Sequence, residues 1–367
     1  EKNNDGFSVT PPSYRMDIRL EAELMEEAAR IIGYDNIPAV LPLAPLSEVI
    51  RPVSQRVKRR LSEALTSAGF FEAVNYSFVS PDAFALASGN DKAGVTVLNP
   101  LTTEQSVMRG SLLPSLLSNL RYNIFQKNDD VRLFEIGPVF FADINGKLPD
   151  EKRRVSGVMY GSRYGGAWNA VKEPVDFYDV KGAVEALLAA CGVSKGVLSF
   201  SSEIEGSCDR LFHPGKSAGV IINGKRAGMF GQAHPDVKEK FELKADAMLF
   251  ELDVDVLVNA YSTRVTKYAA IPKFPESARD IAFIVSEQMP YAEMLSAIEG
   301  LDTKLVEKVE LFDVYCGSPV PKGKKSMAIR ITYRSADRTL RQEEVDELNS
   351  KVAGVLATGF GAQIRIG

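Results

Sequence analysis

The sequence predicts an α+β protein made of three consecutive parts, and three features of the chain support this. Helical apolar periodicity alternates with runs of β-branched and aromatic residues. Short glycine-containing turns such as Asn223-Gly224 join several of these runs, which favours an antiparallel sheet over a doubly wound parallel one. The last part has the order βαββαβ, which predicts a ferredoxin-like sheet with both helices on one face.

The first part runs to about residue 41 and contains one clear helix, Leu20 to Ile32, with Gly33 at its C-terminal cap position. Its acidic side chains share one face with Arg30. That face could hold a divalent cation, because hard ions such as Mg²⁺ prefer carboxylate oxygens; the alternative is a solvated acidic surface. The candidate ligands are Asp17, Glu23, Glu26 and Glu27. A proline-rich stretch, Pro38 to Pro45, follows and is interpreted as a linker.

The middle part, to about residue 271, mixes helices and strands. A basic amphipathic helix is predicted over Ser54 to Gly69, with Val57, Leu61 and Leu65 facing inward. Pro114 is compatible only with the first turn of a helix, as expected for Ser111 to Tyr122. The other predicted elements are a helix over Asp179 to Ala190 and strands over Val131 to Phe141, Arg154 to Gly161, Ala218 to Ile222 and Met248 to Leu252.

The last part supplies the ferredoxin-like order. Its predicted elements are strand Asp280 to Ser286, helix Tyr291 to Ile298, strands Leu305 to Tyr315 and Lys325 to Tyr333, helix Arg341 to Leu356 and strand Gln363 to Ile366. In the third strand, Met327, Ile329, Ile331 and Tyr333 alternate with a more polar set that includes Ser326 and Arg330. The apolar set should lie under the helices, and the polar set should face outward. The phase of Leu305 to Tyr315 stays open, because both of its alternating sets contain apolar residues.

The predicted outward face lies in a basic region of the sequence. Between residues 322 and 341 there are seven basic side chains and one acid, Asp337. A positive sheet face with an exposed tyrosine is typical of a surface that binds phosphates and stacks an unpaired base. An ordinary solvated face is the alternative. The residues predicted to line a basic face are Lys322, Lys324, Lys325, Arg330 and Arg334.

Composition and motifs exclude several classes of protein. The chain has 44 basic and 48 acidic residues, a net charge of −4, so it is not polybasic throughout. Three scattered cysteines are too few for a disulfide framework or a zinc site, and no apolar run is long enough to span a membrane. We therefore expect a cytoplasmic protein without a membrane partner. The first residue is not Met, so we also expect a piece of a longer chain.

No motif indicates a catalytic centre. Gly215 to Gly219 matches G-x-S-x-G, but a strand-like run follows it where a nucleophile elbow needs a helix, so we interpret it as a chance match. No phosphate-binding loop, H-E-x-x-H or dinucleotide-binding G-x-G-x-x-G occurs. From its residues, we therefore expect the chain to have no active site of its own.

Long motifs throughout the chain resemble the beta subunit of the bacterial phenylalanine–tRNA ligase family. Pro11 to Pro38 (PPSYRMDIRLEAELMEEAARIIGYDNIP) resembles its B5 domain. Five segments of this chain resemble the family's non-catalytic class II synthetase-like domain: NPLTTEQSVMRGSLLPSLL, DVRLFEIGPVF, DFYDVKGAVEALL, HPGKSA and MLFELDVDVL. Three later segments resemble the family's ferredoxin-fold anticodon-binding domain: KFPESARDIAF, LFDVYCG and PKGKKSMAIRITY. The resemblance implies domains over 1–41 (B5-like, truncated at its start), 50–260 and 272–366.

The resemblance also implies a function and its partners. The family is an α2β2 heterotetramer that attaches phenylalanine to tRNA(Phe). Its alpha subunit binds ATP and carries out catalysis. In agreement, the motif G-x-G-x-x-R, whose arginine would help to neutralise the ATP phosphates, does not occur between residues 42 and 271. The implied role of this chain is to support the alpha subunit and bind the anticodon. The family's editing domain has no counterpart in this sequence, so editing cannot be attributed to this chain.

Site residues carried over from the family fall in two of the three parts. Mg²⁺, shared with the alpha subunit, would be held by Asp17, Glu23, Glu26 and Glu27, with Glu23 standing where the family usually has Asp. The implied anticodon contacts are Ala282, Asp313, Tyr315 and Ser326, and Tyr315 would stack on a base. Two other functions stay open: a stand-alone RNA-binding module, and a regulatory protein that binds a small ligand on a ferredoxin-like domain.

Overall fold

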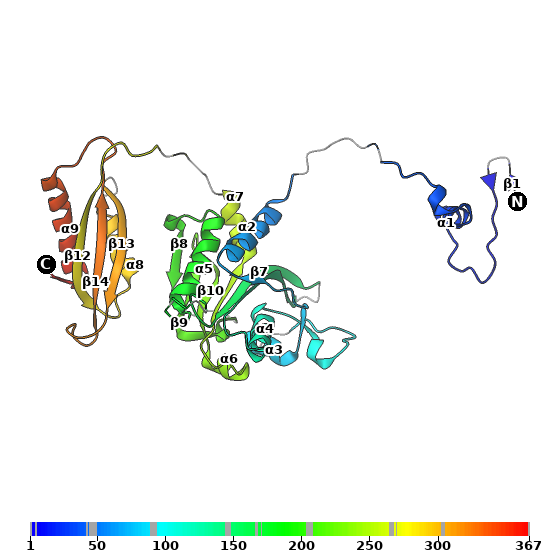
Figure 1. The fold of residues 1–367 in the computed structure, drawn as a ribbon, viewed down its shortest axis with the longest axis horizontal. Coiled ribbons are helices and arrows are strands. Elements are labelled where there is room, and N and C mark those ends of the chain that lie inside the picture. The colour runs from blue at the N-terminus through cyan, green and yellow to red at the C-terminus, as the bar shows by residue number, and fades with distance from the viewer. Residues whose placement is uncertain are drawn as a thin grey trace. The chain divides into compact units, whose positions relative to one another are not determined.

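The structure is a computed structural model. In it the chain forms two compact units, Glu1–Arg264 and Val265–Gly367 (Figure 1). It describes residues 2–3, 6–41, 43, 50–88, 94–143, 148–165, 168–169, 171–202, 208–263, 268, 270–301 and 305–365. Part of the predicted linker (residues 42, 44 and 45) and the end of the last predicted strand, Ile366, lie outside the described residues.

A seven-stranded sheet forms the centre of the first unit (Figure 1). All neighbouring strands in it are antiparallel except β3 and β6, so the prediction of an antiparallel sheet is confirmed. The strand order is β3 (Phe71–Glu72), β6 (Val131–Phe141), β7 (Asp150–Tyr160), β11 (Met248–Asp253), β10 (Lys225–Ala233), β9 (Phe212–Ile222) and β8 (Leu198–Ser201). Residues 215–219 lie inside β9, where the Ser217 hydroxyl donates to the His213 carbonyl at 2.8 Å, so the G-x-S-x-G match is not a nucleophile elbow.

Each face of this sheet has its own apolar core. Helices α2 (Val53–Ser67), α5 (Phe177–Ala190) and α7 (Val254–Thr263) cover one face, and Val57, Leu61 and Leu65 of α2 are buried there as predicted. Helices α4 (Leu113–Phe125) and α6 (Pro235–Lys240) contribute to the core on the other face. The remaining elements of this part are α3 (Pro81–Ser88), the strand pair β4 (Phe78–Val79) and β5 (Val107–Met108), and 3₁₀ turns Thr103–Gln105, Lys195–Val197 and Cys208–Leu211.

Helix α5 begins at Phe177, two residues before the predicted start. The carboxylate of Asp176 accepts hydrogen bonds from the backbone N–H groups of Tyr178 (2.8 Å) and Asp179 (3.2 Å), which caps the helix. Arg163 holds this start in place through ion pairs to Asp176 (2.9 Å) and Asp179 (2.9 Å). The cap at Asp176 thus sets the start of the helix earlier than the prediction, which began it at Asp179.

Two buried carboxylates join loops to the sheet. Arg109 and Glu135 form an ion pair at 2.6 Å with side chains only 2% and 5% exposed. Asn75 also donates to Glu135 at 2.8 Å, so both oxygens of this carboxylate are occupied. Glu251 accepts from the hydroxyl of Ser156 at 2.6 Å and from the backbone N–H of Leu112 at 3.0 Å. These contacts satisfy groups that would otherwise be costly to bury.

The N-terminal segment contains the strand pair β1 (Lys2–Asn3) and β2 (Gly6–Phe7), helix α1 (Glu21–Ile32) and the 3₁₀ turn Tyr34–Asn36. The predicted helix is confirmed, and Gly33 caps it with φ of 94°, a backbone angle that favours glycine. No residue of α1 is buried.

The second unit has the predicted ferredoxin-like fold (Figure 1). Its elements are β12 (Ser277–Ser286), α8 (Tyr291–Glu299), β13 (Val306–Tyr315), β14 (Lys324–Tyr333), α9 (Gln342–Phe360) and β15 (Gln363–Arg365). All pairs in the sheet order β13-β14-β12-β15 are antiparallel. One face packs on both helices, with the apolar set of β14 buried there as predicted: Met327, Ile329, Ile331 and Tyr333. Among the described residues of this unit, no helix packs on the opposite face.

Among the described residues, no helix combines the length and apolarity that crossing a bilayer requires.

The buried ion pair generates a stability prediction. Glu135→Ala should lower the free energy of unfolding of the first unit by about 3–5 kcal/mol, because it leaves the Arg109 guanidinium buried without its carboxylate. Urea denaturation at neutral pH measures this loss. The matched control is Glu63→Ala, which breaks the solvent-exposed Arg59–Glu63 pair and should cost less than about 1 kcal/mol. Equal losses for the two variants would contradict the expectation.

Candidate nucleic-acid interface

The helix-free face of the second unit brings the four predicted anticodon residues together. Residues that pair across antiparallel strands project to the same side of a sheet. Two neighbouring rows cross β12, β14 and β13 in this way. One row is Ala282, Ala328 and Asp313, and the next is Ile284, Ser326 and Tyr315. The register thus places Tyr315 on the open face, a point that the alternation of β13 left undecided.

Tyr315 is the most prominent of these four residues. Its side chain lies against the loop after β13, where its hydroxyl donates to the Ser318 carbonyl at 2.8 Å. Gly317 makes room for the ring, because a Cβ there would approach the Tyr315 hydroxyl to 2.9 Å. The residue remains 47% exposed. An aromatic ring fixed at one edge and open to solvent is suited to stacking.

The other three residues differ in accessibility. Asp313 is exposed and Ala282 is partly buried. Ser326 lies on the open face as predicted but is only 9% exposed, and the larger residues Tyr315 and Ile284 flank it in the same row. Of the four, Tyr315 and Asp313 therefore offer the most surface to a ligand.

Phe312 is a large exposed residue on this face that sequence reasoning missed. The register shifts between Leu311 and Asp313, so Phe312 is an extra residue in β13 without a partner in β14. The guanidinium of Arg330 lies over its ring at 5.5 Å from the centroid. Because Arg330 belongs to the open face, this contact places the Phe312 ring there too. The sequence does carry a sign of this bulge, because the alternation of apolar and polar residues breaks between Leu311 and Asp313.

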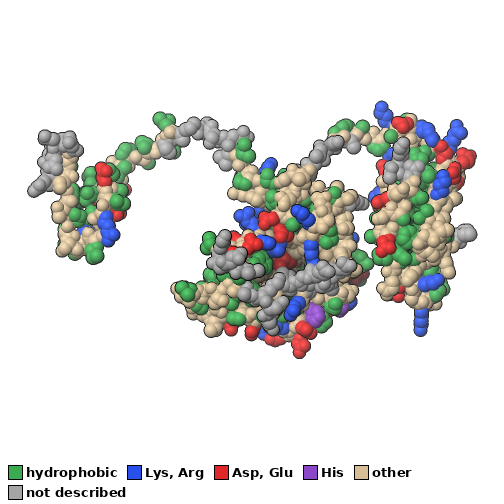
Figure 2. Space-filling model, turned by 180° about the vertical axis from the view of Figure 1, so that it is seen from behind, with side chains coloured by type: hydrophobic (Ala, Val, Ile, Leu, Met, Phe, Trp, Pro, Cys, Tyr) green, Lys and Arg blue, Asp and Glu red, His purple; other side chains and the backbone are tan. Residues whose placement is uncertain are grey.

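The open face is less positive than its sequence predicted. Arg330 donates two hydrogen bonds of 2.8 Å to Asp280, and this contact lowers the pKa of the Asp280 carboxyl. Arg334 forms ion pairs with Glu307 at 2.7 Å and Glu276 at 2.5 Å. The acids come from β12, β13 and the segment before β12, outside the basic stretch of sequence. On the side of the second unit that is visible in Figure 2, basic and acidic side chains are interspersed.

The predicted basic set divides between the two faces of the sheet. Lys325 pairs with buried Val285, so it points to the helix side, and its Nζ donates to the Met289 carbonyl at 2.7 Å. Placing Lys325 on the open face is therefore corrected. Lys324 pairs with Ser286 and shares the side of Ser326, and Lys322 is exposed in the preceding loop. No ion pair to another described residue involves Lys322 or Lys324.

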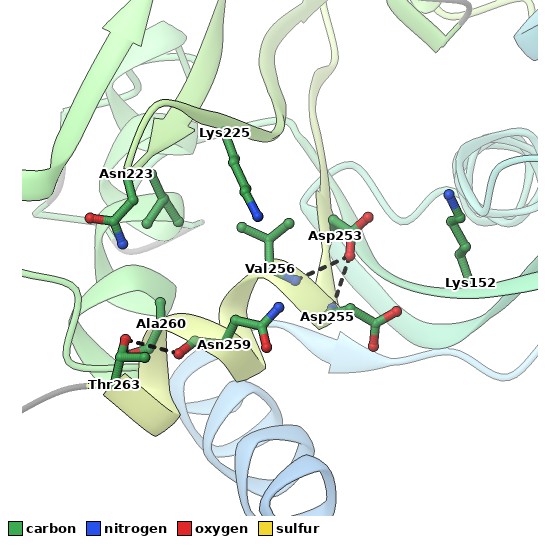
Figure 3. Close-up of a pocket in the computed structure, with 10 residues that line it drawn as sticks. Lys152, Asn223, Lys225, Asp253, Asp255, Val256, Asn259, Ala260 and Thr263 are labelled. Carbon is green, nitrogen blue, oxygen red and sulfur yellow. Dashed lines mark hydrogen bonds between the residues drawn. The ribbon is translucent and has the colours of Figure 1, made fainter.

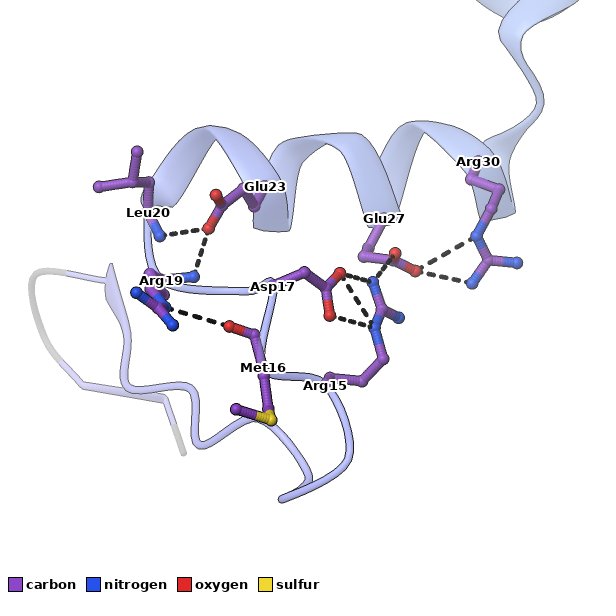
Figure 4. A network of polar contacts seen from close by, with 8 residues as sticks. All are labelled: Arg15, Met16, Asp17, Arg19, Leu20, Glu23, Glu27 and Arg30. Atoms are coloured by element: carbon purple, nitrogen blue, oxygen red, sulfur yellow. Dashed lines mark hydrogen bonds and ion pairs between the residues drawn. The ribbon is translucent and has the colours of Figure 1, made fainter. Parts of the chain in front are cut away.

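Three of the four predicted metal ligands near α1, namely Asp17, Glu23 and Glu27, are engaged with other partners (Figure 4). Arg15 donates to both oxygens of Asp17 and contacts Glu27 at 2.5 Å, and Arg30 also donates to Glu27 at 2.7 Å. These hydrogen bonds lower the pKa of Asp17 and lower that of Glu27 to about 2. A guanidinium thus lies where the carboxylates of Asp17 and Glu27 converge.

Glu23 has a different role, as the capping residue of α1. Its carboxylate accepts from the backbone N–H groups of Arg19 and Leu20, and these contacts lower its pKa (Figure 4). Glu26 is exposed. Within the described residues, no three acidic, histidine or cysteine side chains are grouped so that they could hold a metal ion. As arranged here, the four predicted ligands do not fit an octahedral Mg²⁺ site.

A pocket of about 320 Å³ lies in the first unit between β7, the β9–β10 turn and α7 (Figure 3). Lys152, Lys225 and Asn259 contribute polar groups to its wall. Asp253 is occupied as the cap of α7, accepting from the backbone N–H groups of Asp255 at 2.9 Å and Val256 at 3.3 Å. Among the described wall residues there is no nucleophile hydrogen-bonded to a base, so the pocket does not have the arrangement that nucleophilic catalysis requires.

A second hollow, of about 690 Å³, lies beside the basic helix α2. The guanidinium groups of Arg60 and Arg56 lie 5.3 and 6.0 Å from the ring centroid of Tyr261. Arg59 is paired with Glu63 at 2.7 Å. The wall of this hollow is positively charged, but three of its arginines already contact Tyr261 or Glu63 of the same unit.

Comparison with known protein families gives three matches in order along the chain. A model described as tRNA synthetase B5 domain matches residues 1–34. The phenylalanyl tRNA synthetase beta chain CLM domain matches residues 37–254, more than half of the chain. The ferredoxin-fold anticodon binding domain matches residues 272–365.

Curated relatives match over the whole chain. The phenylalanine–tRNA ligase beta subunit of Syntrophotalea carbinolica is 40% identical over 369 residues, covering 100% of this chain and 45% of its own length. That of Geobacter sulfurreducens is 39% identical, covering 98% and 45%. The chain therefore spans about 45% of the length of these relatives. A solved pyrrolysyl tRNA synthetase from Desulfitobacterium hafniense aligns over 65% of this chain and 71% of its own, with a TM-score of 0.44 and 15% identity, too low to support a conclusion.

The contacts around Glu27 predict an unusual titration. Its carboxyl should titrate near pH 2, and Arg15→Gln should raise that midpoint toward the ordinary value, because the strongest hydrogen-bond donor is removed. Since the folded pKa is lowered, the stabilisation from Glu27 is present above the unfolded pKa and is lost as the pH falls toward 2. Carboxyl ¹³C NMR across pH 1.5 to 7 measures the midpoint.

The matched control is Arg19→Gln, because the Arg19 side chain donates to the Met16 carbonyl and not to Glu27. It should leave the Glu27 midpoint unchanged. An ordinary midpoint for Glu27 in the unmodified chain would show that the Arg15 contact does not form in solution.

Proposed function

The chain belongs to the phenylalanyl-tRNA synthetase beta chain family, and we propose that it acts as a non-catalytic, anticodon-binding part of that enzyme. In this role its second unit contacts the anticodon of tRNA(Phe), and its first unit supports a catalytic alpha subunit. The division of the chain into 1–41, 50–260 and 272–366 belongs to the same proposal.

One observation carries the anticodon assignment: Ala282, Asp313, Tyr315 and Ser326 lie in two adjacent rows on the helix-free face of the sheet. An exposed ring can stack on an unpaired base, and a carboxylate beside it can accept hydrogen bonds from the amino and imino groups at the base edge. Tyr315 and Asp313 are the exposed members of this set and would make these two contacts.

The assembled enzyme is proposed as an α2β2 heterotetramer in the cytoplasm. ATP would bind to the alpha subunit, since neither hollow described in the first unit has a phosphate-binding loop or a catalytic pair in its wall. Magnesium shared with the alpha subunit would have to displace Arg15 from Asp17 and Glu27. Ligase activity is therefore proposed for the complex and not for this chain alone.

Family membership favours this proposal over the two alternatives. A stand-alone RNA-binding module would not need the B5 and CLM regions that match the family here. A small-ligand regulatory domain would need an enclosed site, whereas the conspicuous groups of the second unit, Tyr315 and Phe312, lie on an open sheet face.

Base stacking on Tyr315 generates a binding prediction. Tyr315→Ala in the full chain should weaken binding of an anticodon stem-loop RNA of tRNA(Phe) by about 1–3 kcal/mol, the usual contribution of one aromatic–base stack. Fluorescence anisotropy with labelled RNA measures the affinity. Tyr178→Ala, which removes an exposed tyrosine on α5, is the control and should bind as the unmodified chain does. Equal affinities for Tyr315→Ala and the control would contradict the assignment.

The division of the lysines between the two faces predicts a weak salt dependence. If Lys322 and Lys324 contact phosphates, the slope of log K against log[salt] should be near −1.4, about −0.7 for each contact to a single strand. Lys324→Ala should reduce the slope by about half. Lys325→Ala is the control, because this neighbouring lysine points to the helix side and should leave the slope unchanged. Equal slopes for the two variants would contradict the face assignment.

A further inference from the structure

Phe312 is conspicuous because a large apolar ring is exposed on the helix-free face of the sheet, which also carries Tyr315 and the partly buried Ile284. It is 55% exposed and lies at a register shift in β13. A bulge of this kind aims a side chain in a direction that regular pairing would not give it. The exposed Phe312 ring shares this helix-free face with the exposed Tyr315 ring, and neighbouring exposed aromatic rings are typical of a surface on which successive bases stack.

Arg330 fixes the ring from one side. Its guanidinium lies 5.5 Å from the Phe312 centroid and is itself held by two hydrogen bonds of 2.8 Å to Asp280. A guanidinium and an aromatic face attract each other, and the double hydrogen bond limits the positions that the guanidinium can take. The charge of Arg330 is therefore largely compensated by Asp280, and the group is placed to orient the ring.

We propose that Phe312 is a second stacking platform for an unpaired RNA base, next to the platform that Tyr315 would provide, and that Arg330 is its positioning residue. The inference rests on the proposed anticodon-binding function and extends it from one stacked nucleotide to two. Phe312 and Tyr315 are three residues apart on β13, about 10 Å along the strand. One base cannot cover both rings, so neighbouring nucleotides occupy them, as successive bases do on other aromatic platforms.

The test uses the full chain and an anticodon stem-loop RNA of tRNA(Phe) with the fluorescent base 2-aminopurine placed at one loop position at a time. Stacking on a ring changes the fluorescence of that base. Tyr315→Ala should abolish the change at one position, and Phe312→Leu should abolish it at a neighbouring one. Phe312→Leu should also weaken binding about 5- to 150-fold, while Phe312→Tyr, which keeps a ring, should retain both signals.

Phe125 supplies a matched control in the first unit. It is also an exposed phenylalanine with an arginine over its ring, since the Arg121 guanidinium lies 4.9 Å from its centroid. Phe125→Leu should leave affinity and all fluorescence positions unchanged. Arg330→Gln tests the positioning role and should reduce the signal at the Phe312 position only. If Phe312→Leu fails to fold, Arg330→Gln still tests the inference, because an unchanged signal at the Phe312 position would contradict it.

The outcomes separate this inference from the function on which it rests. If Tyr315→Ala weakens binding but Phe312→Leu keeps wild-type affinity and signals, the second platform is wrong and anticodon binding stands. If Phe312→Leu weakens binding without a loss at any one position, the contact is apolar but not stacking, and the inference is overturned. If the unmodified chain binds the stem-loop no better than one with a scrambled loop, the proposed function fails and the inference with it.

Discussion

The alternation of side chains along β14 is the constraint on which the candidate interface depends. Met327, Ile329, Ile331 and Tyr333 lie under α8 and α9, where they are removed from water. With that side assigned, Ser326, Ala328 and Arg330 must occupy the opposite face. A slip of one residue would exchange the two sets, so burial of the core also sets the face offered to a ligand. The neighbouring strands inherit the same division through their register with β14.

Pairing of arginines with carboxylates sets the electrostatic character of both candidate sites. On the open sheet face, Asp280, Glu276 and Glu307 compensate Arg330 and Arg334. Near α1, Arg15 does the same for Asp17 and Glu27. Exposed pairs of this kind add little stability, but they reduce the charge available to an external phosphate or metal ion. Recognition on the sheet is therefore expected to depend more on rings and base edges than on net charge.

The first unit uses its buried polar groups in a different way. Glu135 and Glu251 are surrounded by donors from loops and neighbouring strands, so their charge serves to hold those segments on the sheet. The two hollows in this unit have walls whose polar groups are largely engaged within the protein. Through these contacts the loops are fixed on a rigid sheet.

The sequence by itself determined the elements that depend on local periodicity: the buried stripe of α2, the ferredoxin-like order, the antiparallel sheet, the cap at Gly33 and the apolar side of β14. Only the tertiary structure decided the phase of β13, the exposure of Phe312, the shielding of Ser326, the direction of Lys325 and the partners of Arg15 and Arg330. The reason is physical. Periodicity reports which side of one segment is apolar, whereas a bulge, an ion pair or a flanking side chain depends on residues that the fold brings from distant positions in the chain.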